Sequence, residues 1–318
     1  MWKQSALSLV LLLLIVPAAL GQEVQGLLAT SQRWEGEIVL AGPVSIGPEA
    51  VLTIAPGTRI RPAQPTALIS VLGRLMVQGT AERPVVFAHL AGWQGIQLFD
   101  APTGSHFEHV RFEGAETAIS AIASVFSVSR SSFGNCGTAI KLLREATATI
   151  EDSLFSDNRI GIDNQMKSKA TISRNRFTKH QETAVIITHN SSGSIAGNRF
   201  DNNHQGIGVI QKYPDRITGN TFLTNKTGIY CNQTQGTPLL RDNLFEKNEN
   251  ALINHSFSYP LVENNRFLSN ETAIRNDQFG SPQVRRNLFK DNGTALFNNR
   301  KSNPQLENNR IENNQTAL

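Results

Sequence analysis

Cysteine, charge and long apolar runs are all scarce in this 318-residue chain, and each scarcity narrows what the protein can be. There are only two cysteines, so at most one disulfide could form within the chain. Charged residues make up 18% of the sequence, without the concentrated Lys/Arg run that nucleic-acid-binding proteins show. Beyond residue 21, no segment reaches the ~20 consecutive apolar residues that a transmembrane helix needs. We therefore expect no nucleic-acid partner and no membrane span in the mature chain.

Residues 1–21 have the pattern of a secretory signal peptide. Lys3 supplies a positive charge, residues 7–16 form an apolar segment, and small residues precede the predicted cleavage point. An uncleaved membrane anchor is the alternative, but the apolar stretch is short and is interrupted at Pro17. The sequence thus predicts an extracytoplasmic protein, periplasmic or secreted, that begins at Gln22.

What the sequence has in abundance is asparagine, placed in a repeat of about 22 residues. Apolar anchors recur at intervals of 21 to 23 residues: Phe112, Phe133, Phe155, Phe177, Phe200, Phe222, Phe245, Phe267, Phe289 and Ile311. An apolar residue stands five positions before each anchor, and from Asn175 onward an asparagine stands two positions before it. The consensus is V/I/L-x-x-N-x-F-x-x-N-x-x-A/G-I/L.

This period predicts an all-β, single-stranded right-handed parallel β-helix. A leucine-rich repeat would need a different leucine spacing and usually a helical return, and neither is present. In a β-helix, each turn of the coil lies ~4.8 Å above the last, so like side chains stack into apolar columns and asparagine ladders. We expect about thirteen rungs over residues 38–318, preceded by an N-terminal cap segment over residues 22–37.

The early rungs resemble a known superfamily. The stretches VLTIAPGTRI from Val51, GRLMVQGTAERPVVF ending at Phe87, and Trp93-Gln94-Gly95-Ile96 resemble the opening rungs of exported proteins of the pectate-lyase-like superfamily. The later rungs are similar to its parallel β-helix repeat modules, including NosD-like periplasmic proteins of copper-site maturation. This resemblance implies the fold, but not one activity, because the superfamily holds lyases, hydrolases, epimerases and non-enzymes.

Sites that the resemblance implies for enzymes are not found. The lyases hold calcium through clustered carboxylates, but the acidic residues here alternate with Thr, Leu and Lys in their column. The hydrolase motifs N-T-D, D-D and G-H-G do not occur. His106 and His109 have opposite parity on a strand, which disfavours a metal site there. We predict no catalytic residues, no bound metal and no cofactor.

The repeat also predicts whether the cysteines form a disulfide and whether the glycosylation motifs are accessible. Cys136 and Cys231 lie four rungs apart, ~19 Å, whereas a disulfide needs Cα atoms within about 7 Å. Both are expected to be free and buried. The Asn-x-Thr sequences at Asn225 and Asn270 fall in the inward ladder column, so we expect no glycan there.

A candidate binding surface comes from the only segment that varies freely between rungs, the insert that precedes each pre-anchor strand. Its exposed aromatic and cationic side chains would suit an extended sugar, although solvated loops would also explain them. The candidate ligand-binding residues are Lys167, Lys169, His189, Lys212, Tyr213, His255, Tyr259, Phe279, Arg300 and Lys301.

The function we predict is an exported, non-catalytic β-helix that binds or scaffolds an extended glycan or another cell-envelope component. One alternative is a carbohydrate-active enzyme of lyase, hydrolase or epimerase type, and another is a periplasmic metal-delivery protein. The chain stops at Leu318 on a regular rung, so we expect its last edge either to pair with another subunit in an edge-to-edge homo-oligomer or to fray.

Overall fold

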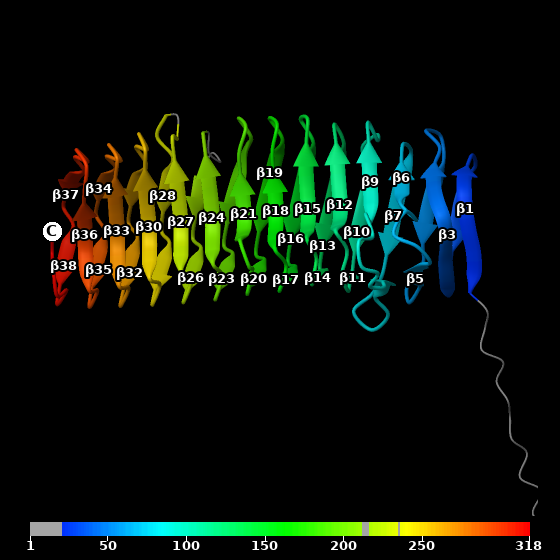
Figure 1. The fold of residues 1–318 in the computed structure, drawn as a ribbon, viewed down its shortest axis with the longest axis horizontal. Helices are drawn as coiled ribbons and strands as arrows, with labels where there is room; N and C mark the ends of the chain where they lie inside the picture. Colours follow the sequence, from blue (N-terminus) through cyan, green and yellow to red (C-terminus); the bar gives the residue numbers. More distant parts are fainter. Residues whose placement is uncertain (1–20, 212–215, 235) are drawn as a thin grey trace, which may run out of the picture.

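The computed structural model describes residues 21–211, 216–234 and 236–318, and shows one straight rod of stacked coils (Figure 1). Every strand pairing is parallel, and each turn of the coil adds one strand to each of three walls. The predicted parallel β-helix is therefore confirmed, with thirteen strands in the first wall. In these described residues, no helix has the length and apolar character that crossing a membrane would require.

The first wall is the 13-stranded sheet, and it carries the apolar residue five positions before each anchor. Its strands are β2 (Gln32–Trp34), β4 (Val51–Ile54), β7 (Arg74–Gln78), β10 (Ser105–Glu108), β13 (Val125–Ser129), β16 (Thr147–Glu151), β19 (Lys169–Ser173), β22 (Ser192–Ala196), β25 (Arg216–Thr218), β28 (Leu239–Arg241), β31 (Leu261–Glu263), β34 (Gln283–Arg285) and β37 (Gln305–Glu307).

The second wall, here called the phenylalanine wall, carries the anchors. Its strands are β5 (Arg59–Pro62), β8 (Val85–Phe87), β11 (Val110–Phe112), β14 (Ser132–Gly134), β17 (Leu154–Ser156), β20 (Arg176–Thr178), β23 (Arg199–Asp201), β26 (Thr221–Leu223), β29 (Leu244–Glu246), β32 (Arg266–Leu268), β35 (Leu288–Lys290) and β38 (Arg310–Glu312).

The third wall begins the rod and is joined to the second through the long strand β3, which pairs with both β5 and β6. Its strands are β1 (Gln22–Leu28), β3 (Glu37–Ile46), β6 (Ile69–Val71), β9 (Ile96–Phe99), β12 (Thr117–Ile122), β15 (Thr138–Leu143), β18 (Ile160–Asn164), β21 (Thr183–Ile187), β24 (Gln205–Ile210), β27 (Thr227–Asn232), β30 (Asn250–His255), β33 (Thr272–Asp277) and β36 (Thr294–Asn298).

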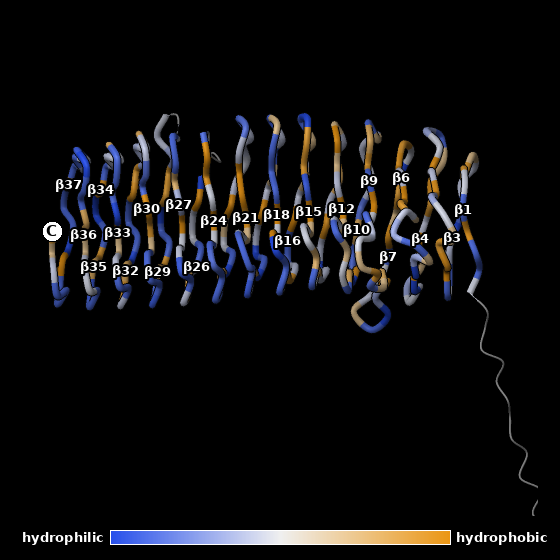
Figure 2. Tube along the Cα trace, in the orientation of Figure 1, coloured by the Kyte–Doolittle hydropathy of each residue, from blue (hydrophilic) through white to orange (hydrophobic). Residues whose placement is uncertain are grey.

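The core is a continuous file of phenylalanine rings. Phe177 and Phe200 are stacked with ring centroids 4.9 Å apart, and Phe200 and Phe222 repeat that distance. Stacking continues without interruption from Phe87 to Phe289. A rung alone could not bury its ring, so each rung depends on the neighbours above and below it. Hydrophobic and hydrophilic residues accordingly alternate around each coil (Figure 2).

Two asparagine ladders bind the rungs together, as the repeat predicts. In the first ladder, Asn198 Nδ2 donates to Asn220 Oδ1 over 3.1 Å and to the carbonyl of Ile172 over 2.9 Å. In the second, Asn203 Nδ2 donates to Asn225 Oδ1 over 2.9 Å. Each amide therefore satisfies polar groups of both adjacent rungs, which lets it be buried without an orphaned donor or acceptor.

Three further predictions concern the cysteines, the N-terminal segment and the signal peptide. Cys136 and Cys231 are both free and buried, as expected. Residues 22–37 hold β1 and β2, which pair with β3 and β4 at the start of the stack. The predicted signal peptide lies outside the described residues, apart from Gly21.

His180 replaces asparagine in the second ladder and makes a specific prediction about acid stability. Its Nδ1 donates to Asn203 Oδ1 over 2.8 Å, and Asn158 Nδ2 lies 3.4 Å from Nε2, an arrangement that fits only the neutral ring. Burial lowers the pKa of His180 to about 4, against an ordinary value of 6.5. Below pH 6.5 the unfolded chain takes up a proton that the folded chain refuses, so stability falls with pH until the folded pKa is reached.

The variant His180→Asn restores the residue that the ladder uses elsewhere. Between pH 6.5 and pH 4, the natural chain should lose up to roughly 3 kcal/mol of folding free energy through His180, because one pKa unit corresponds to about 1.4 kcal/mol. The variant should not show this loss. Urea unfolding at several pH values measures this. Parallel pH profiles for the variant and the natural chain would show that His180 is not the responsible group.

Candidate functional site

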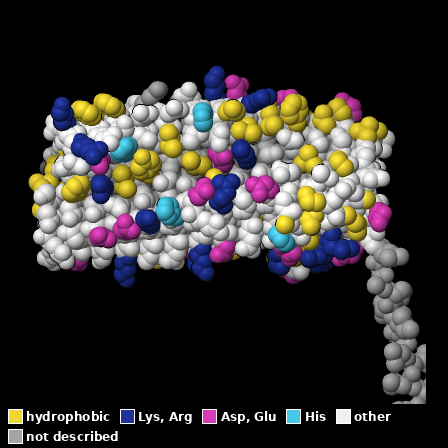
Figure 3. Space-filling view, in the orientation of Figure 1, with side chains coloured by type: hydrophobic (Ala, Val, Ile, Leu, Met, Phe, Trp, Pro, Cys, Tyr) yellow, Lys and Arg dark blue, Asp and Glu magenta, His cyan; other side chains and the backbone are white. Residues whose placement is uncertain are grey.

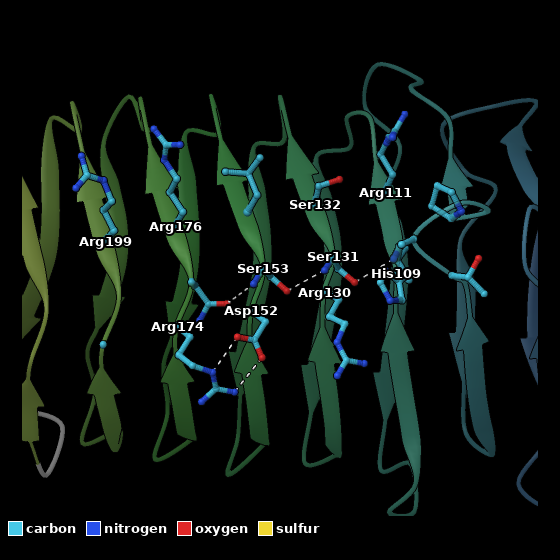
Figure 4. A pocket seen from close by; sticks show the side chains of 17 residues that line it. His109, Arg111, Arg130, Ser131, Ser132, Asp152, Ser153, Arg174, Arg176 and Arg199 are labelled. Carbon is cyan, nitrogen blue, oxygen red and sulfur yellow. Dashed lines mark hydrogen bonds and ion pairs between the residues drawn. The ribbon is translucent and has the colours of Figure 1, made fainter.

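A groove of about 780 Å³ runs along the corner where the first wall turns into the phenylalanine wall (Figure 4). Its lining extends from the loop at Thr80 to Pro84, across strands β11, β14, β17 and β20, to Arg199 in β23. The groove thus crosses successive rungs and lies parallel to the rod axis. It is a surface for an extended ligand rather than an enclosed pocket for a small one.

The repeat itself builds this corner. Residues three before each anchor, such as Arg130, Asp152 and Arg174, adopt left-handed backbone conformations with φ between 49° and 55°. That conformation turns the chain, and it leaves these side chains outside while the ladder residue that follows points inward. Residues one before the anchor, such as Arg176, also face outward, since side chains alternate along a strand.

The floor of the groove differs from the rest of the corner. Here serine replaces asparagine in the first ladder, and Ser131 Oγ accepts from the backbone nitrogen of Val110 over 3.0 Å. Ser153 Oγ in turn accepts from the backbone nitrogen of Ser131 over 3.0 Å (Figure 4). Serine keeps the hydrogen bond between rungs with a shorter side chain.

Arginines dominate the charge of the groove. Arg111, Arg130, Arg174, Arg176 and Arg199 line it, and Asp152 is the single carboxylate in its lining. On the face of the rod shown in Figure 3, basic and acidic side chains lie beside one another. Most of the groove's arginines are paired with carboxylates.

The pairing is ladder-like, between neighbouring rungs. Arg174 Nε lies 2.8 Å from Asp152 Oδ1, and its Nη2 lies 2.6 Å from Glu151 Oε2. The hydrogen bond from Arg174 and its charge hold the pKa of Asp152 below the usual value. Arg130 pairs with Glu108 at 2.5 Å. These arginines are more than half exposed, so such pairs contribute little to stability and their guanidinium groups still face solvent.

Two further arginines share one buried carboxylate. Arg176 Nε lies 2.9 Å from Asp201 Oδ2, and Arg199 Nε lies 2.8 Å from Asp201 Oδ1. The side chain of Asp201 is only 2% exposed, whereas the arginines are 59% and 47% exposed. The buried carboxylate of Asp201 therefore fixes both guanidinium groups through their Nε atoms and leaves Nη donors toward solvent.

Arg111 differs from the others. Among the residues that the structure describes, no carboxylate lies within 4.0 Å of its guanidinium nitrogens. It is exposed and lies at the N-terminal end of the groove, on β11. An anionic ligand would find in Arg111 a cation that no neighbouring carboxylate neutralises.

The same corner carries arginine beyond the groove. At the positions one, three and four residues before the anchors from Phe112 to Ile311, every cationic side chain except His109 is arginine, and we call these arginines the arginine corner. It consists of Arg111, Arg130, Arg174, Arg176, Arg199, Arg241, Arg266, Arg285, Arg286 and Arg310. Arginine presents a planar fork of donors that matches a carboxylate in two-point contact, which lysine cannot do.

Four of the ligand-binding residues predicted from the inserts form two groups away from this groove. Lys167 and His189 line a second hollow of about 570 Å³. About five rungs away, ~24 Å, Lys301 Nζ lies 5.8 Å from the ring centroid of Phe279. The Phe279 ring is itself stacked on Phe257 at 4.9 Å.

The other predicted residues are more scattered. His255 ends β30, with its ring 6.2 Å from that of Tyr230, and the side chain of Tyr259 is 42% exposed. Lys169 starts β19 in the first wall, and Arg300 occupies a left-handed turn position with φ of 49°. Lys212 and Tyr213 lie outside the described residues.

One carboxylate has the environment of a proton-transfer group. Asp163, on the third wall, is 5% exposed, and burial raises its pKa although Gln165 Nε2 donates to both of its oxygens, at 2.8 and 2.6 Å. Over the parts of the chain that the structure describes, no three His, Cys, Asp or Glu side chains gather as metal ligands would.

The arginine-lined groove was missed by the prediction from sequence, although its signal was present. The two variable positions that flank the ladder asparagine in N-x-F rungs appear only as x in the consensus, and no role was predicted for them. Aligned by rung, they place Arg176 directly beside Arg199 in strand register.

Comparison with known proteins agrees with this architecture. Residues 117–259 match the family model described as right handed beta helix region. The match agrees with the right-handed parallel β-helix fold predicted from the repeat.

Two solved structures are similar. One is a mutant of the periplasmic alginate epimerase AlgG, 12% identical, with a TM-score of 0.50 over 88% of this chain and 76% of that one. The other is the same epimerase without that mutation, 13% identical, with a TM-score of 0.45 over 86% and 74%. Such identities establish a common fold alone. Among curated proteins, none matches this chain.

Proposed function

We propose that this protein is an exported, non-catalytic β-helix that binds an extended acidic glycan in the arginine-lined groove. The observation that carries the proposal is the groove itself, in which guanidinium groups from four of five successive rungs face one channel along the axis. Export rests on the signal-peptide pattern of residues 1–21. The similar fold of a periplasmic alginate epimerase is consistent with a glycan ligand.

The electrostatics of the groove favour binding over proton transfer. Its lining carboxylate, Asp152, has a lowered pKa and stays ionised, paired with Arg174. A general base or acid works best with a pKa near the operating pH, and guanidinium groups do not give up protons in that range. The chemistry of these residues is therefore recognition of fixed negative charge.

Arg111 provides the sharpest test. We expect Arg111→Gln to weaken binding of a polygalacturonate fragment about tenfold, because a hydrogen bond to a charged group contributes roughly 1.5 kcal/mol or more. Calorimetry at low salt measures the dissociation constant, and rising salt should weaken binding by the natural chain.

The matched control is Arg266→Gln. Arg266 occupies the same file as Arg111, one residue before an anchor, but it lies beyond the lining of the groove. Its replacement should leave the binding of a short fragment unchanged. Equal loss in both variants would mean that charge in general attracts the polymer, and no binding to the natural chain would overturn the proposed function.

The catalytic alternative rests on Asp163, the buried carboxylate with a raised pKa. A carbohydrate-active enzyme could use such a group as a general base or acid. Incubation of the polymer with the protein, followed by analysis of chain length and of the sugar stereochemistry, distinguishes the two functions. A product that is formed by the natural chain and lost in Asp163→Asn would replace binding with catalysis.

A further inference from the structure

Asp201 places a buried negative charge directly beneath two arginines of the groove. It follows the inward anchor Phe200, so its side chain leaves the outer face of the phenylalanine wall. Arg176 Nε donates to Asp201 Oδ2 over 2.9 Å, and Arg199 Nε donates to the same oxygen over 3.0 Å. Among the residues that the structure describes, no other group donates a hydrogen bond to this carboxylate. The two arginines are therefore the groups that Asp201 serves.

Arg176 and Arg199 are also the one place in their file where two arginines are neighbours. At the position one residue before each anchor, from Arg111 to Arg310, arginine occupies successive rungs only here. Strand register places the two residues opposite each other, ~4.8 Å apart along the rod, and both side chains lie on the same side of the wall (Figure 4). Like charges that face each other across neighbouring strands repel, so without a carboxylate these guanidinium groups would move apart into solvent.

The shared carboxylate offsets this repulsion and still leaves donors for a ligand. Both hydrogen bonds use Nε, and within the described parts of the chain neither arginine donates from an Nη atom to another protein group. The planar fork of Nη donors thus remains toward solvent on each arginine. Because a buried carboxylate needs its ionic partners, this arrangement exists before any ligand arrives.

We propose that Asp201 is a positioning residue, which holds Arg176 and Arg199 side by side as one preformed receptor for the carboxylates of an acidic glycan. This inference rests on the proposed function of the groove. Its consequence is opposite to simple attraction, because a negative charge beneath the site strengthens the binding of a negative ligand. Without that charge the ligand would have to order two long side chains itself, and the entropy lost in ordering them opposes binding.

The variant Asp201→Asn keeps the size of the side chain and removes its charge. Positioning predicts that polygalacturonate fragments bind this variant about tenfold more weakly than the natural chain, the order expected for ordering two arginine side chains. Attraction by net charge alone predicts tighter binding, since the variant is one charge more positive. The direction in which the dissociation constant changes, measured by calorimetry at low salt, therefore decides between the two.

A second variant removes the same charge in another way. Asp201→Thr places at this position the residue that the preceding rung has in register, Thr178. It carries the same prediction and keeps the test available if the asparagine variant does not fold. Thermal unfolding of each variant shows whether it is folded.

Glu246→Gln is the control for net charge. Glu246 lies in the same column as Asp201, two rungs further on, and outside the lining of the groove. Its substitution changes the net charge by the same amount, and the cation beside it is Lys247, at 3.9 Å, rather than an arginine. We expect the fragments to bind Glu246→Gln as they bind the natural chain.

The positions of the arginines can also be followed without ligand. In the natural chain, hydrogen bonding to Asp201 should slow the exchange of the Nε protons of Arg176 and Arg199 with solvent, which nuclear magnetic resonance measures. In Asp201→Asn both protons should exchange faster. The Nε proton of Arg174, bonded to Asp152 over 2.8 Å, is the internal reference and should be unchanged, whereas a general loosening of the fold would affect all three.

The outcomes separate this inference from the proposed function. Weaker binding to the Asp201 variants, unchanged binding to Glu246→Gln and faster exchange at Arg176 and Arg199 alone support the inference. If acidic fragments bind the natural chain but bind Asp201→Asn equally or more tightly, or if the two Nε protons stay protected in that variant, the inference is overturned while the proposed function stands. If no acidic fragment binds the natural chain, the proposed function has failed and the inference fails with it.

Discussion

Replacing Phe222 with alanine is expected to lower the free energy of unfolding by about 3–5 kcal/mol, the usual cost of removing a fully buried aromatic ring. The Phe222 ring is completely buried and packs between Phe200, at 4.9 Å, and Phe245, at 4.7 Å. The truncation therefore leaves a cavity with one ring on either side. Because each rung is stabilised mainly by its neighbours, the loss should spread to the adjacent rungs.

The control is Phe297→Ala, on an outward position of the third wall. Its ring is 41% exposed and lies 5.1 Å from the guanidinium carbon of Arg275, a contact of about 0.5–1 kcal/mol at an exposed site. Equilibrium unfolding in urea should show a small loss for Phe297→Ala and a large one for Phe222→Ala. Similar losses would contradict the continuous ring file as the main source of stability.

The stacking of this core could be predicted because its residues recur in the sequence at a nearly constant interval. A residue such as Phe200 recurs after 22 or 23 positions, and in a parallel coil that interval becomes direct overlap. The same logic predicted the buried fate of Cys136, which takes the position of a ladder asparagine: its backbone nitrogen donates to Asn158 Oδ1 over 2.8 Å. Residues in columns that repeat one residue type over many rungs were predictable in this way.

A third, shorter ladder shows where this reasoning stopped. Asn254 Nδ2 donates to Asn276 Oδ1 over 2.9 Å, and Asn276 Nδ2 donates to Asn298 Oδ1 over 2.8 Å. On the rung before it, the same position is Cys231, so the column changes character after too few rungs to appear as a pattern. Asn254 and Asn276 are buried on the third wall, where an amide needs a partner because water is absent, whereas Asn298 is exposed.

The functional site was less predictable than the fold for a physical reason. Core columns repeat one residue type, whereas a binding surface needs a particular arrangement at a few rungs. Arg111, Asp152 and Gly197 occupy positions whose residue types vary along the rod. Only the register of the walls shows that they line one groove, and only the coordinates show which arginine is paired with which carboxylate.

Replacing Asn225 with leucine should cost roughly 3–5 kcal/mol, although the two side chains are similar in size. Asn225 Oδ1 accepts from the backbone nitrogen and from Nδ2 of Asn203, both over 2.9 Å, and its Nδ2 donates to the carbonyl of Phe200 over 3.0 Å. Leucine would remove all three bonds. Asn203 Nδ2 would keep its bond to the Phe177 carbonyl, but the backbone nitrogen of Asn203 and the carbonyl of Phe200 would lose these partners, and each orphaned buried group costs about 1–3 kcal/mol.

Two matched substitutions test whether hydrogen bonding is the cause. Asn225→Ser should lose less, because a hydroxyl keeps the bond between rungs in the other ladder, where Ser153 Oγ accepts from Ser131. Asn250→Thr should be close to neutral, since Asn250 is partly exposed and its column holds Thr227 and Thr272 on the adjacent rungs. Urea unfolding should therefore order the variants from leucine through serine to the Asn250 control. If Asn225→Leu lowered the free energy of unfolding no more than Asn250→Thr, the asparagine ladders would not contribute measurably to the stability of the coil.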